Sequence, residues 1–308
     1  MFSNHNRFFI VPGAPKAGST SLYHYLRQHP EIFLPHLKES RFFTGEMLWN
    51  TLGHNRTTVF EPAVFENLYS DANPDQLFGD LGNSYMMFPE YAIKNIQAYL
   101  PSADIKIVFV LRDPVQRAYS AYLYACREGI ETKTFQQGLA LETERFKERY
   151  LAPEIISYLG ASRYYRPVQL FSEAFPTEVI TLEALEAQPV AVFKRLLRFL
   201  EVADYSEAID FSPKNKGGWV PAHPIANQLV FNYQKKLKKL RPYFEIFPMA
   251  GRFAAASVKT LQRLRQKTPA QQAPPLGHDD EMYLREHLAE DVQQLRKYLN
   301  RSFDEWSI

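Results

Sequence analysis

The stretch from Gly13 to Ser21, GAPKAGSTS, sets one lysine among small residues and is the part of the sequence best suited to binding an anion. Four apolar residues, Phe8 to Val11, precede it and are typical of a short buried strand. From Leu22 onward, apolar residues recur at amphipathic helical spacing. Backbone N–H groups at the start of a helix converge on an anion, and the helix dipole assists them. The pattern therefore predicts a strand, an anion-binding loop around Lys16, and a helix.

The two glycines of this loop, Gly13 and Gly18, are spaced as in the nucleotide P-loop G-x-x-x-x-G-K-[ST], but the lysine is displaced. Ser19 follows the second glycine, and Lys16 lies two positions before that glycine. A mononucleotide P-loop needs its lysine at the β- and γ-phosphates and the next Ser or Thr on Mg²⁺, so the displacement argues against such a site. The alternative is a Gly/Ser-rich turn that binds no ligand.

A second anion-binding element is predicted in the middle of the chain. Asp104–Leu111, DIKIVFVL, is a nearly continuous apolar run of the kind found inside parallel sheets. Arg112 ends it, Pro114 opens a helix, and Ser120 follows two helical turns later. A guanidinium and a hydroxyl can bind one anion from two sides, and open α/β sheets bind ligands at the carboxyl ends of their strands. The alternative is that Arg112 pairs with a carboxylate and that Ser120 is a surface residue.

Similar patterns predict the elements that position these residues. They are extended segments at Ile32–Leu34 and Glu178–Leu182, a strand leading into a loop over Leu77–Tyr85, and helices at Glu90–Leu100, Phe135–Arg149, Val190–Leu200, Ile225–Arg241, Ala254–Lys267 and Glu281–Asn300. Residues 268–277, TPAQQAPPLG, are predicted to be a loose linker.

Composition limits the class of protein. The 308 residues predict one domain, 1–308, with a basic helical flap and linker at 220–278 inside it. The single cysteine, Cys126, excludes an intramolecular disulfide framework, and no signal peptide or membrane span is evident, so we expect a cytoplasmic protein. Net charge is +2, but residues 214–267 contain twelve Lys or Arg and only one acid, a local balance of +11 that leaves −9 for the remainder. This segment predicts a basic surface, although such runs are often only solvated.

The loop P-K-A-G-S-T-S resembles the 5′-phosphosulfate loop of sulfotransferases that use 3′-phosphoadenosine 5′-phosphosulfate (PAPS). Three further segments follow in the order found in bacterial and heparan-type sulfotransferases. They are K-E-S-R-F-F at 38–43, R-D-P followed by R-x-x-S at 112–120, and K-G-G at 216–218. The resemblance spans nearly the whole chain and implies an α/β, three-layer P-loop-like fold with a central parallel sheet flanked by helices.

The resemblance also implies roles for individual residues. Lys16 would stabilise the leaving phosphate and Glu39 would take the proton of the acceptor, with no metal required. The implied cofactor-binding residues are Lys16, Ala17, Gly18, Ser19, Thr20, Ser21, Arg112, Ser120, Tyr164, Lys216, Gly217 and Gly218. The implied substrate-binding residues are Arg41, Asp80 and Tyr85. Arg41 stands where the family often has histidine, and Leu81 stands where it usually has lysine.

The implied partners are PAPS and an acceptor hydroxyl or amine. The basic segment favours an acidic acceptor, such as an anionic glycan, a glycolipid at a membrane surface, or a hydroxyacyl group on an acyl carrier protein, and peripheral attachment to a membrane would suit the second of these. No nucleic-acid motif is evident. Two alternatives are a P-loop nucleotide kinase, for which Asp113 lies near the place of a Mg²⁺ ligand, and a non-catalytic module that binds polyanions or membranes.

Overall fold

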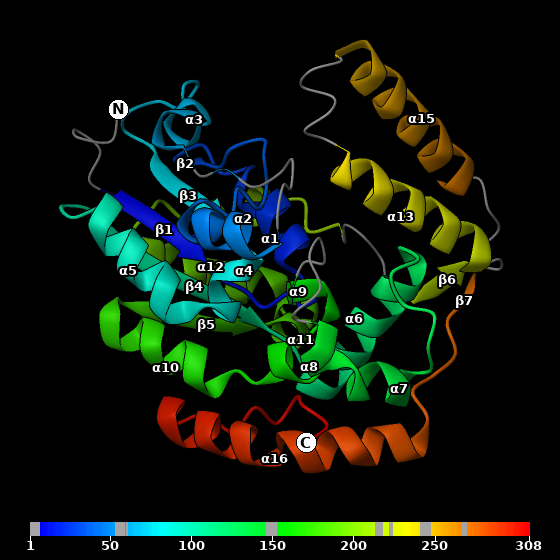
Figure 1. Cartoon of the computed structure of the whole chain (residues 1–308). Helices are drawn as coiled ribbons and strands as arrows, with labels where there is room; N and C mark the ends of the chain where they lie inside the picture. Colours follow the sequence, from blue (N-terminus) through cyan, green and yellow to red (C-terminus); the bar gives the residue numbers. More distant parts are fainter. Residues whose placement is uncertain are drawn as a thin grey trace.

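The structure, a computed structural model, describes residues 7–52, 59, 61–145, 153–212, 218–221, 224–240, 248–266 and 270–308. Its centre is a sheet of five parallel strands in the order β2-β3-β1-β4-β5, with helices on both faces (Figure 1). In chain order the strands are β1 Arg7–Val11, β2 Ile32–Phe33, β3 Leu77–Leu81, β4 Asp104–Leu111 and β5 Thr177–Thr181. The predicted three-layer α/β fold is confirmed.

The helices of the described ranges surround this sheet. In chain order they are α1 Ser19–Leu26, η2 Phe42–Thr44, α2 Gly45–Leu52, α3 Pro62–Asn67, α4 Asn83–Met87, α5 Pro89–Tyr99, α6 Pro114–Arg127, α7 Phe135–Ala140, α8 Glu142–Arg145, α9 Pro153–Ile156, η3 Gly160–Ser162, α10 Tyr165–Ala174, α11 Leu182–Ala187, α12 Pro189–Leu200, η4 Ser206–Ala208, α13 Pro224–Lys239, α15 Pro248–Gln266 and α16 His278–Leu299.

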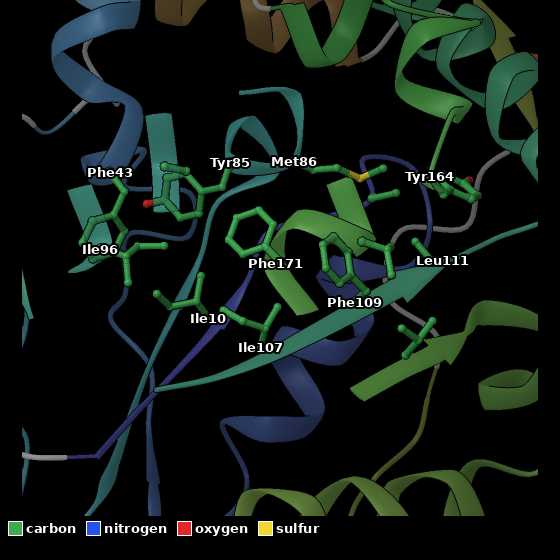
Figure 2. Close-up of a cluster of buried hydrophobic side chains, with 14 of the residues drawn as sticks. Ile10, Phe43, Tyr85, Met86, Ile96, Ile107, Phe109, Leu111, Tyr164 and Phe171 are labelled. Carbon is green, nitrogen blue, oxygen red and sulfur yellow. The ribbon is translucent and has the colours of Figure 1, made fainter. Parts of the chain in front are cut away.

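Strand β4 shows why its sequence is nearly continuously apolar. Ile107, Phe109 and Leu111 lie in a buried cluster with residues of α4, α5 and α10 (Figure 2). Val108 and Val110 point to the opposite face and pack with residues of α1 and α12. Because side chains of a strand alternate between faces and both faces of this sheet are covered, the run from Ile107 to Leu111 is apolar throughout, whereas the buried Lys106 pairs with Glu201 at 2.8 Å.

The last helix, α16, packs against the α/β body through one stripe. Its buried residues recur every three to four positions and are Leu284, Leu288, Val292 and Leu295. The chain then returns over the sheet, where Trp306 is buried, stacks on Phe303 at 4.2 Å between ring centroids and lies 5.8 Å from the Tyr164 ring. The helix predicted over Glu281–Asn300 is confirmed as α16, which packs against the body.

The helix predicted over Phe135–Arg149 is wrong in its extent. Helix α7 ends at Ala140, and α8 begins at Glu142 and ends at Arg145. The break has a physical reason, because the Glu142 carboxylate is buried and accepts the N–H groups of Tyr158, Leu159 and Gly160 at 3.0, 2.8 and 2.8 Å. The residues after β3 also differ from the prediction, since they form α4 rather than a loop.

The basic segment forms a helical hairpin of α13 and α15, and α15 begins six residues earlier than predicted. The linker predicted over 268–277 is partly ordered, because β7 Ala270–Gln272 pairs antiparallel with β6 Trp219–Pro221. The Tyr119 hydroxyl of α6 also donates to the carbonyl oxygen of Pro274 at 2.8 Å. The hairpin is therefore joined to the body at its base, as Figure 1 shows.

Candidate active site

The loop between β1 and α1 is held to the sheet by hydrogen bonds with β4. The N–H of Ala14 donates to the carbonyl oxygen of Val110 at 2.7 Å, and the N–H of Val110 donates to that of Gly13 at 2.9 Å. A Cβ atom on Gly13 would lie 2.8 Å from the Met86 sulfur, so only glycine fits without displacing that side chain. The loop thus begins at a fixed place at the carboxyl end of the sheet.

Helix α1 begins at Ser19, with Gly18 as its N-cap residue at φ 90°. A Cβ atom on Gly18 would meet Leu182 at 2.6 Å, and the positive φ itself favours glycine. No side chain caps the helix, and its first turn contains no acidic residue. The leading N–H groups of α1 are therefore left without a side-chain acceptor, which is the arrangement that binds anions at helix N-termini.

Lys16 lies in this loop with its ammonium 4.1 Å from the centre of the Tyr124 ring. Burial lowers the pKa of Lys16 to about 8, and the positive charges of Arg127 and Arg112 act in the same direction. Within the described ranges, Lys16 forms no ion pair with a carboxylate. A bound anion would relieve this repulsion, so the charge arrangement favours an anionic ligand beside Lys16.

Arg112 follows β4, and its guanidinium donates to the backbone oxygen of Lys16 at 3.5 Å. Its own backbone oxygen accepts the hydroxyl of Tyr164 at 2.9 Å. Tyr164 is fully buried, and burial raises its pKa, so the hydroxyl stays a donor at all physiological pH values. Tyr164, predicted to contact the cofactor, therefore positions the Arg112 backbone in this structure.

Three residues of α6 share one face because they are spaced at i, i+4 and i+7: Ser120, Tyr124 and Arg127. The Arg127 guanidinium lies 4.8 Å from the Tyr124 ring centre, on whose ring Lys16 also packs. Sequence reasoning identified Ser120 but missed Tyr124 and Arg127. Their helical spacing from Ser120 was a signal that could have found them.

Glu39 lies next to the cationic loop and is held by donors on both sides. Its Oε1 atom accepts from the Lys38 ammonium and from the Asn83 side-chain amide, both at 2.7 Å, and its Oε2 atom lies 3.7 Å from the Arg41 guanidinium. Burial would raise the pKa of Glu39, but the charges of Lys38 and Arg41 outweigh it and hold that pKa below its usual value. Glu39 is therefore ionised at neutral pH and able to accept a proton.

Arg41 is buried and forms an ion pair with Glu154 of α9, with its Nη2 and Nε atoms 2.7 and 3.0 Å from the same carboxylate oxygen. The structure therefore places this predicted substrate-binding residue between Glu154 and Glu39. Leu81, at the position usual for lysine in the resemblance, is buried in the core. Asn83, two residues later, is the donor that reaches Glu39.

The other two predicted substrate-binding residues, Asp80 and Tyr85, lie 1% and 0% exposed beneath the Glu39 segment. The Tyr85 hydroxyl donates to Asp80 at 2.5 Å, and the Ser40 hydroxyl donates to the second carboxylate oxygen at 3.0 Å. Burial raises the pKa of Asp80 to about 6. In this structure these side chains support the turn that carries Glu39.

Six non-glycine residues of the described ranges have positive φ, and three of them are site residues: Lys16 at 67°, Glu39 at 66° and Arg41 at 58°. A left-handed conformation costs a side-chain-bearing residue on the order of 1–3 kcal/mol. Such strain is retained where the surrounding structure requires it, and it is concentrated at functional sites. The strained backbone positions therefore include the same charged residues, Lys16, Glu39 and Arg41, that the electrostatics of the site point to.

Two residues of the R-D-P…R-x-x-S segment have structural partners. The Asp113 carboxylate caps α6 by accepting the N–H groups of Val115 and Gln116 at 2.9 and 3.2 Å, and its other oxygen accepts the N–H of Ser307 at 2.7 Å. Its oxygens are thus engaged by backbone donors, unlike those of a Mg²⁺ ligand.

Arg117 is fully buried and donates to the Ser162 hydroxyl at 2.8 Å and to the backbone oxygens of Ser157 and Tyr158. It fixes the segment that leads to Tyr164.

The described part of the chain thus brings together Lys16, Glu39 and Arg112 with the start of α1. Lys216 and Gly217 lie outside the described residues, and Gly218, at φ 88°, accepts the N–H of Ala273 at 2.9 Å beside β6.

The described ranges contain neither a metal-binding cluster nor a membrane-spanning helix. No group of three or more His, Cys, Asp or Glu side chains there could hold a metal ion. None of the helices that the structure describes combines the length and apolar character needed to cross a bilayer.

Comparison with known families gives a match to the part of the chain that carries the main site residues. A family model described as "Sulfotransferase domain" matches residues 6–215. These residues contain the β1–α1 loop, the Glu39 segment and Arg112.

Individual relatives are more distant. The chain is 27% identical over 223 residues to "Bifunctional heparan sulfate N-deacetylase/N-sulfotransferase 4" of Mus musculus, with 70% of this chain and 25% of that protein covered. It is 27% identical over 232 residues to the similarly named protein 3 of Homo sapiens, with 68% and 24% covered. The chain thus spans about a quarter of the length of these relatives.

A solved structure has the same fold over its whole length. "Crystal Structure of Sulfotransferase from Alicyclobacillus acidocaldarius" is similar with a TM-score of 0.68 and 23% identity, and 99% of each chain is covered.

Proposed function

The chain belongs to the sulfotransferase domain family, and we propose that it transfers a sulfuryl group from PAPS to a hydroxyl or amine of an acceptor. The observation that carries this proposal is the pair of cations beside the uncapped start of α1. Lys16 and Arg112 have no carboxylate partner within the described ranges, and the Arg112 guanidinium reaches the Lys16 backbone. Positive side chains and a helix N-terminus without a side-chain cap at one place suit a ligand with more than one anionic group.

The residues present fit PAPS, which carries a 5′-phosphosulfate and a separate 3′-phosphate. The β1–α1 loop with Lys16 would hold the phosphosulfate, and Arg112 with Ser120 would hold the 3′-phosphate. PAPS supplies a sulfuryl group on an activated bond to phosphate. This division of roles is supported by the position of Arg112, whose backbone oxygen accepts a hydrogen bond from the Tyr164 hydroxyl.

Two side chains and the N–H groups at the start of α1 would carry the transfer. Glu39, ionised and oriented by Lys38 and Asn83, would accept the acceptor proton as the new bond to sulfur forms. Lys16 and the N–H groups at the start of α1 would stabilise the negative charge that develops on the departing phosphate oxygen. Electrostatic groups fixed before the reaction stabilise such charge without reorganisation, and the hydrogen bonds of the β1–α1 loop with Val110 hold the loop that carries Lys16.

The proposed division of the ligand predicts a preference for 3′-phosphoadenosine 5′-phosphate (PAP) over AMP, which lacks the 3′-phosphate. Each charge-assisted hydrogen bond contributes about 1.5–3 kcal/mol. Isothermal titration should therefore show PAP binding at least roughly tenfold more tightly than AMP. Equal affinities of the two nucleotides would contradict the assignment of PAPS as donor.

A matched pair of variants tests which residue gives this preference. Arg112→Ala should weaken PAP binding and bring it close to that of AMP, while AMP affinity changes little. Arg163→Ala, which removes an exposed arginine from the same region, should leave both affinities unchanged. A preference that survives Arg112→Ala would place the 3′-phosphate elsewhere.

For the acceptor, we propose an acidic molecule that the basic segment attracts. The heparan sulfate names of the relatives favour an anionic glycan, and the charge of residues 214–267 suits a glycolipid or an acyl carrier protein equally well. Attraction by charge should weaken with salt, because the Debye length shortens from ~10 Å at 0.1 M to ~3 Å at 1 M.

A screen with PAPS labelled in its sulfate should therefore give a product with one of these three acceptor classes and show a higher acceptor KM at high salt. Exchange of Lys235, Lys236, Lys238 and Lys239 for glutamine should raise the acceptor KM in the same way and leave PAP affinity unchanged. If neither salt nor the variant with four substitutions alters the acceptor KM, these lysines are solvated surface residues that do not bind the acceptor.

A further inference from the structure

The hairpin of α13 and α15 is fixed at its base and projects from the body (Figure 1). At the base, Asn227 is 2% exposed and donates to the backbone oxygen of Arg127 at 2.6 Å. A Cβ atom on Gly129 would lie 2.3 Å from the Asn227 backbone, so the two segments are in close contact. Between the helices, the hydroxyls of Tyr233 and Ser257 are 2.9 Å apart. The hairpin is therefore a defined unit attached beside α6.

This hairpin carries the most exposed large apolar side chains of the described ranges. Phe253, Met249 and Leu229 are 70%, 69% and 65% exposed, and Leu240 is 45% exposed. Five others are exposed by 53% or less and are dispersed over the body. Fully exposed phenylalanine and methionine side chains are unfavourable in water, so their concentration on one element indicates a surface that is covered in use.

Three of these residues lie together at the turn of the hairpin. Leu240 follows the end of α13, while Met249 and Phe253 are one helical turn apart at the start of α15. The two helices pack with Tyr233 beside Ser257, so the end of α13 and the start of α15 lie on the same side. Leu240, Met249 and Phe253 therefore lie at the end of the hairpin farthest from the base. We call Leu240, Met249 and Phe253 the apolar tip.

The two described helices that carry the apolar tip contain basic but no acidic side chains. Helices α13 and α15 contain eight Lys or Arg residues and no Asp or Glu. Lys236, Arg252 and Lys259 are among the exposed ones. On α15, Met249, Arg252, Phe253 and Lys259 fall on one helical face, so apolar and cationic side chains alternate along it.

We propose that the apolar tip docks on an anionic lipid bilayer. Apolar side chains flanked by Lys and Arg are the composition of helices that lie in the membrane interface, where the apolar groups enter the acyl boundary and the cations remain among the headgroups. A soluble polyanion would engage the cations but leave Phe253 and Met249 in water. Lipid is therefore the partner that accounts for both features.

Docking would also set the position of the active site. Asn227 joins the hairpin to Arg127, the cation that lies on the Tyr124 ring beside Lys16. The site around Lys16 would thus be joined to the docked hairpin through the hairpin's base. The inference does not depend on sulfuryl transfer, since vesicle binding and nucleotide binding are separate measurements.

The test is flotation of the full chain with vesicles of phosphatidylcholine alone or with about a third of phosphatidylserine. The wild-type chain should float with the anionic vesicles and remain largely free with the neutral ones. The double variant Met249→Ser/Phe253→Ser should lower the partition coefficient on anionic vesicles at least about tenfold, because buried apolar area contributes to interfacial binding. Lys236→Gln/Arg252→Gln should lower it roughly fivefold per charge.

The matched control is Val64→Ser/Met282→Ser, which removes two apolar side chains, 46% and 53% exposed, from α3 and α16. It should bind vesicles like the wild type. Wild-type binding by the Met249/Phe253 variant would overturn the proposal in favour of charge alone, as for a polyanion. Failure of the wild-type chain to bind anionic vesicles would overturn it as well and leave an acidic protein as the candidate partner.

A second measurement does not depend on loss of binding. In Phe253→Trp the new indole should show a blue-shifted emission on addition of anionic vesicles and quenching by brominated acyl chains, whereas Met282→Trp should show neither. An indole at position 253 that floats with the vesicles but is not quenched would contradict insertion of the tip. PAP affinity, measured on each variant, shows that the site remains folded.

Discussion

Exchange of Lys16 for alanine is expected to reduce turnover by about 10²–10³-fold, the effect of removing one fixed electrostatic donor from a developing oxyanion. PAP affinity should fall as well, by tenfold or more, since a charge-assisted hydrogen bond to the ground-state ligand is lost. The joint loss distinguishes Lys16 from a residue that acts only in the transition state. Single-turnover kinetics and isothermal titration measure the two effects separately. A variant that loses binding alone would remove Lys16 from the chemistry.

The lowered pKa of Lys16 adds a dependence on pH. The protonated ammonium attracts the anion, so PAP affinity should decrease as the pH rises from 7 through about 8, where the free enzyme loses this proton. Lys16→Arg keeps the charge over this range, and its PAP affinity should not decrease there. A wild-type affinity that stays constant from pH 7 to well above pH 8 would mean that Arg112 and the helix N–H groups dominate binding.

Exchange of Glu39 for glutamine is expected to reduce turnover by ~10² to 10⁴-fold, the usual contribution of a general base. PAP affinity should remain nearly unchanged, because the glutamine amide can still accept the Asn83 hydrogen bond and the loop around Lys16 is not altered. The comparison of single-turnover rates with PAP titrations in one preparation tests both statements.

Glu46→Gln is the matched control, since Glu46 is an exposed carboxylate at the start of α2, a few residues away in the chain. It should retain wild-type turnover. If Glu39→Gln also retains it, the base lies elsewhere, and His36 and Asp80 are the next candidates. Asp80 would then have to leave its hydrogen bonds with Tyr85 and Ser40.

The parts of the fold that could be predicted are those whose signals are local. The strand Asp104–Leu111 has the predicted bounds because burial on both faces favours a nearly continuous apolar run. The strand, loop and helix around Lys16 could also be predicted from local signals. Their small residues, glycine spacing and helical periodicity all lie within about twenty positions.

The features that were missed depend on contacts between distant segments. Strands β6 and β7 have three residues each and pair across about fifty positions, so neither carries a periodic signal of its own. The helix over Phe135–Arg149 was predicted too long because its break serves Glu142, whose backbone donors lie sixteen to eighteen residues later.

The site shows the same division between local and distant signals. Lys16, Glu39 and Arg112 could be assigned from motifs, but the motif also included Arg117, whose partners Ser157 and Ser162 make it a buried brace. The structural role of Arg117 could not be predicted, because its partners lie forty to forty-five residues later in the chain.

The hydrogen bond from Ser307 to Asp113 has a consequence for the order of folding. It joins residues 194 positions apart and closes the segment after α16 onto the end of β4. Contacts of such long range form late, because the entropy of closing the intervening chain must be overcome first. We therefore expect β1, α1 and β4 to assemble before the Arg112 turn reaches its final form. Amide hydrogen exchange at Ser307 should then slow when PAP binds, since ligand binding and local closure stabilise each other.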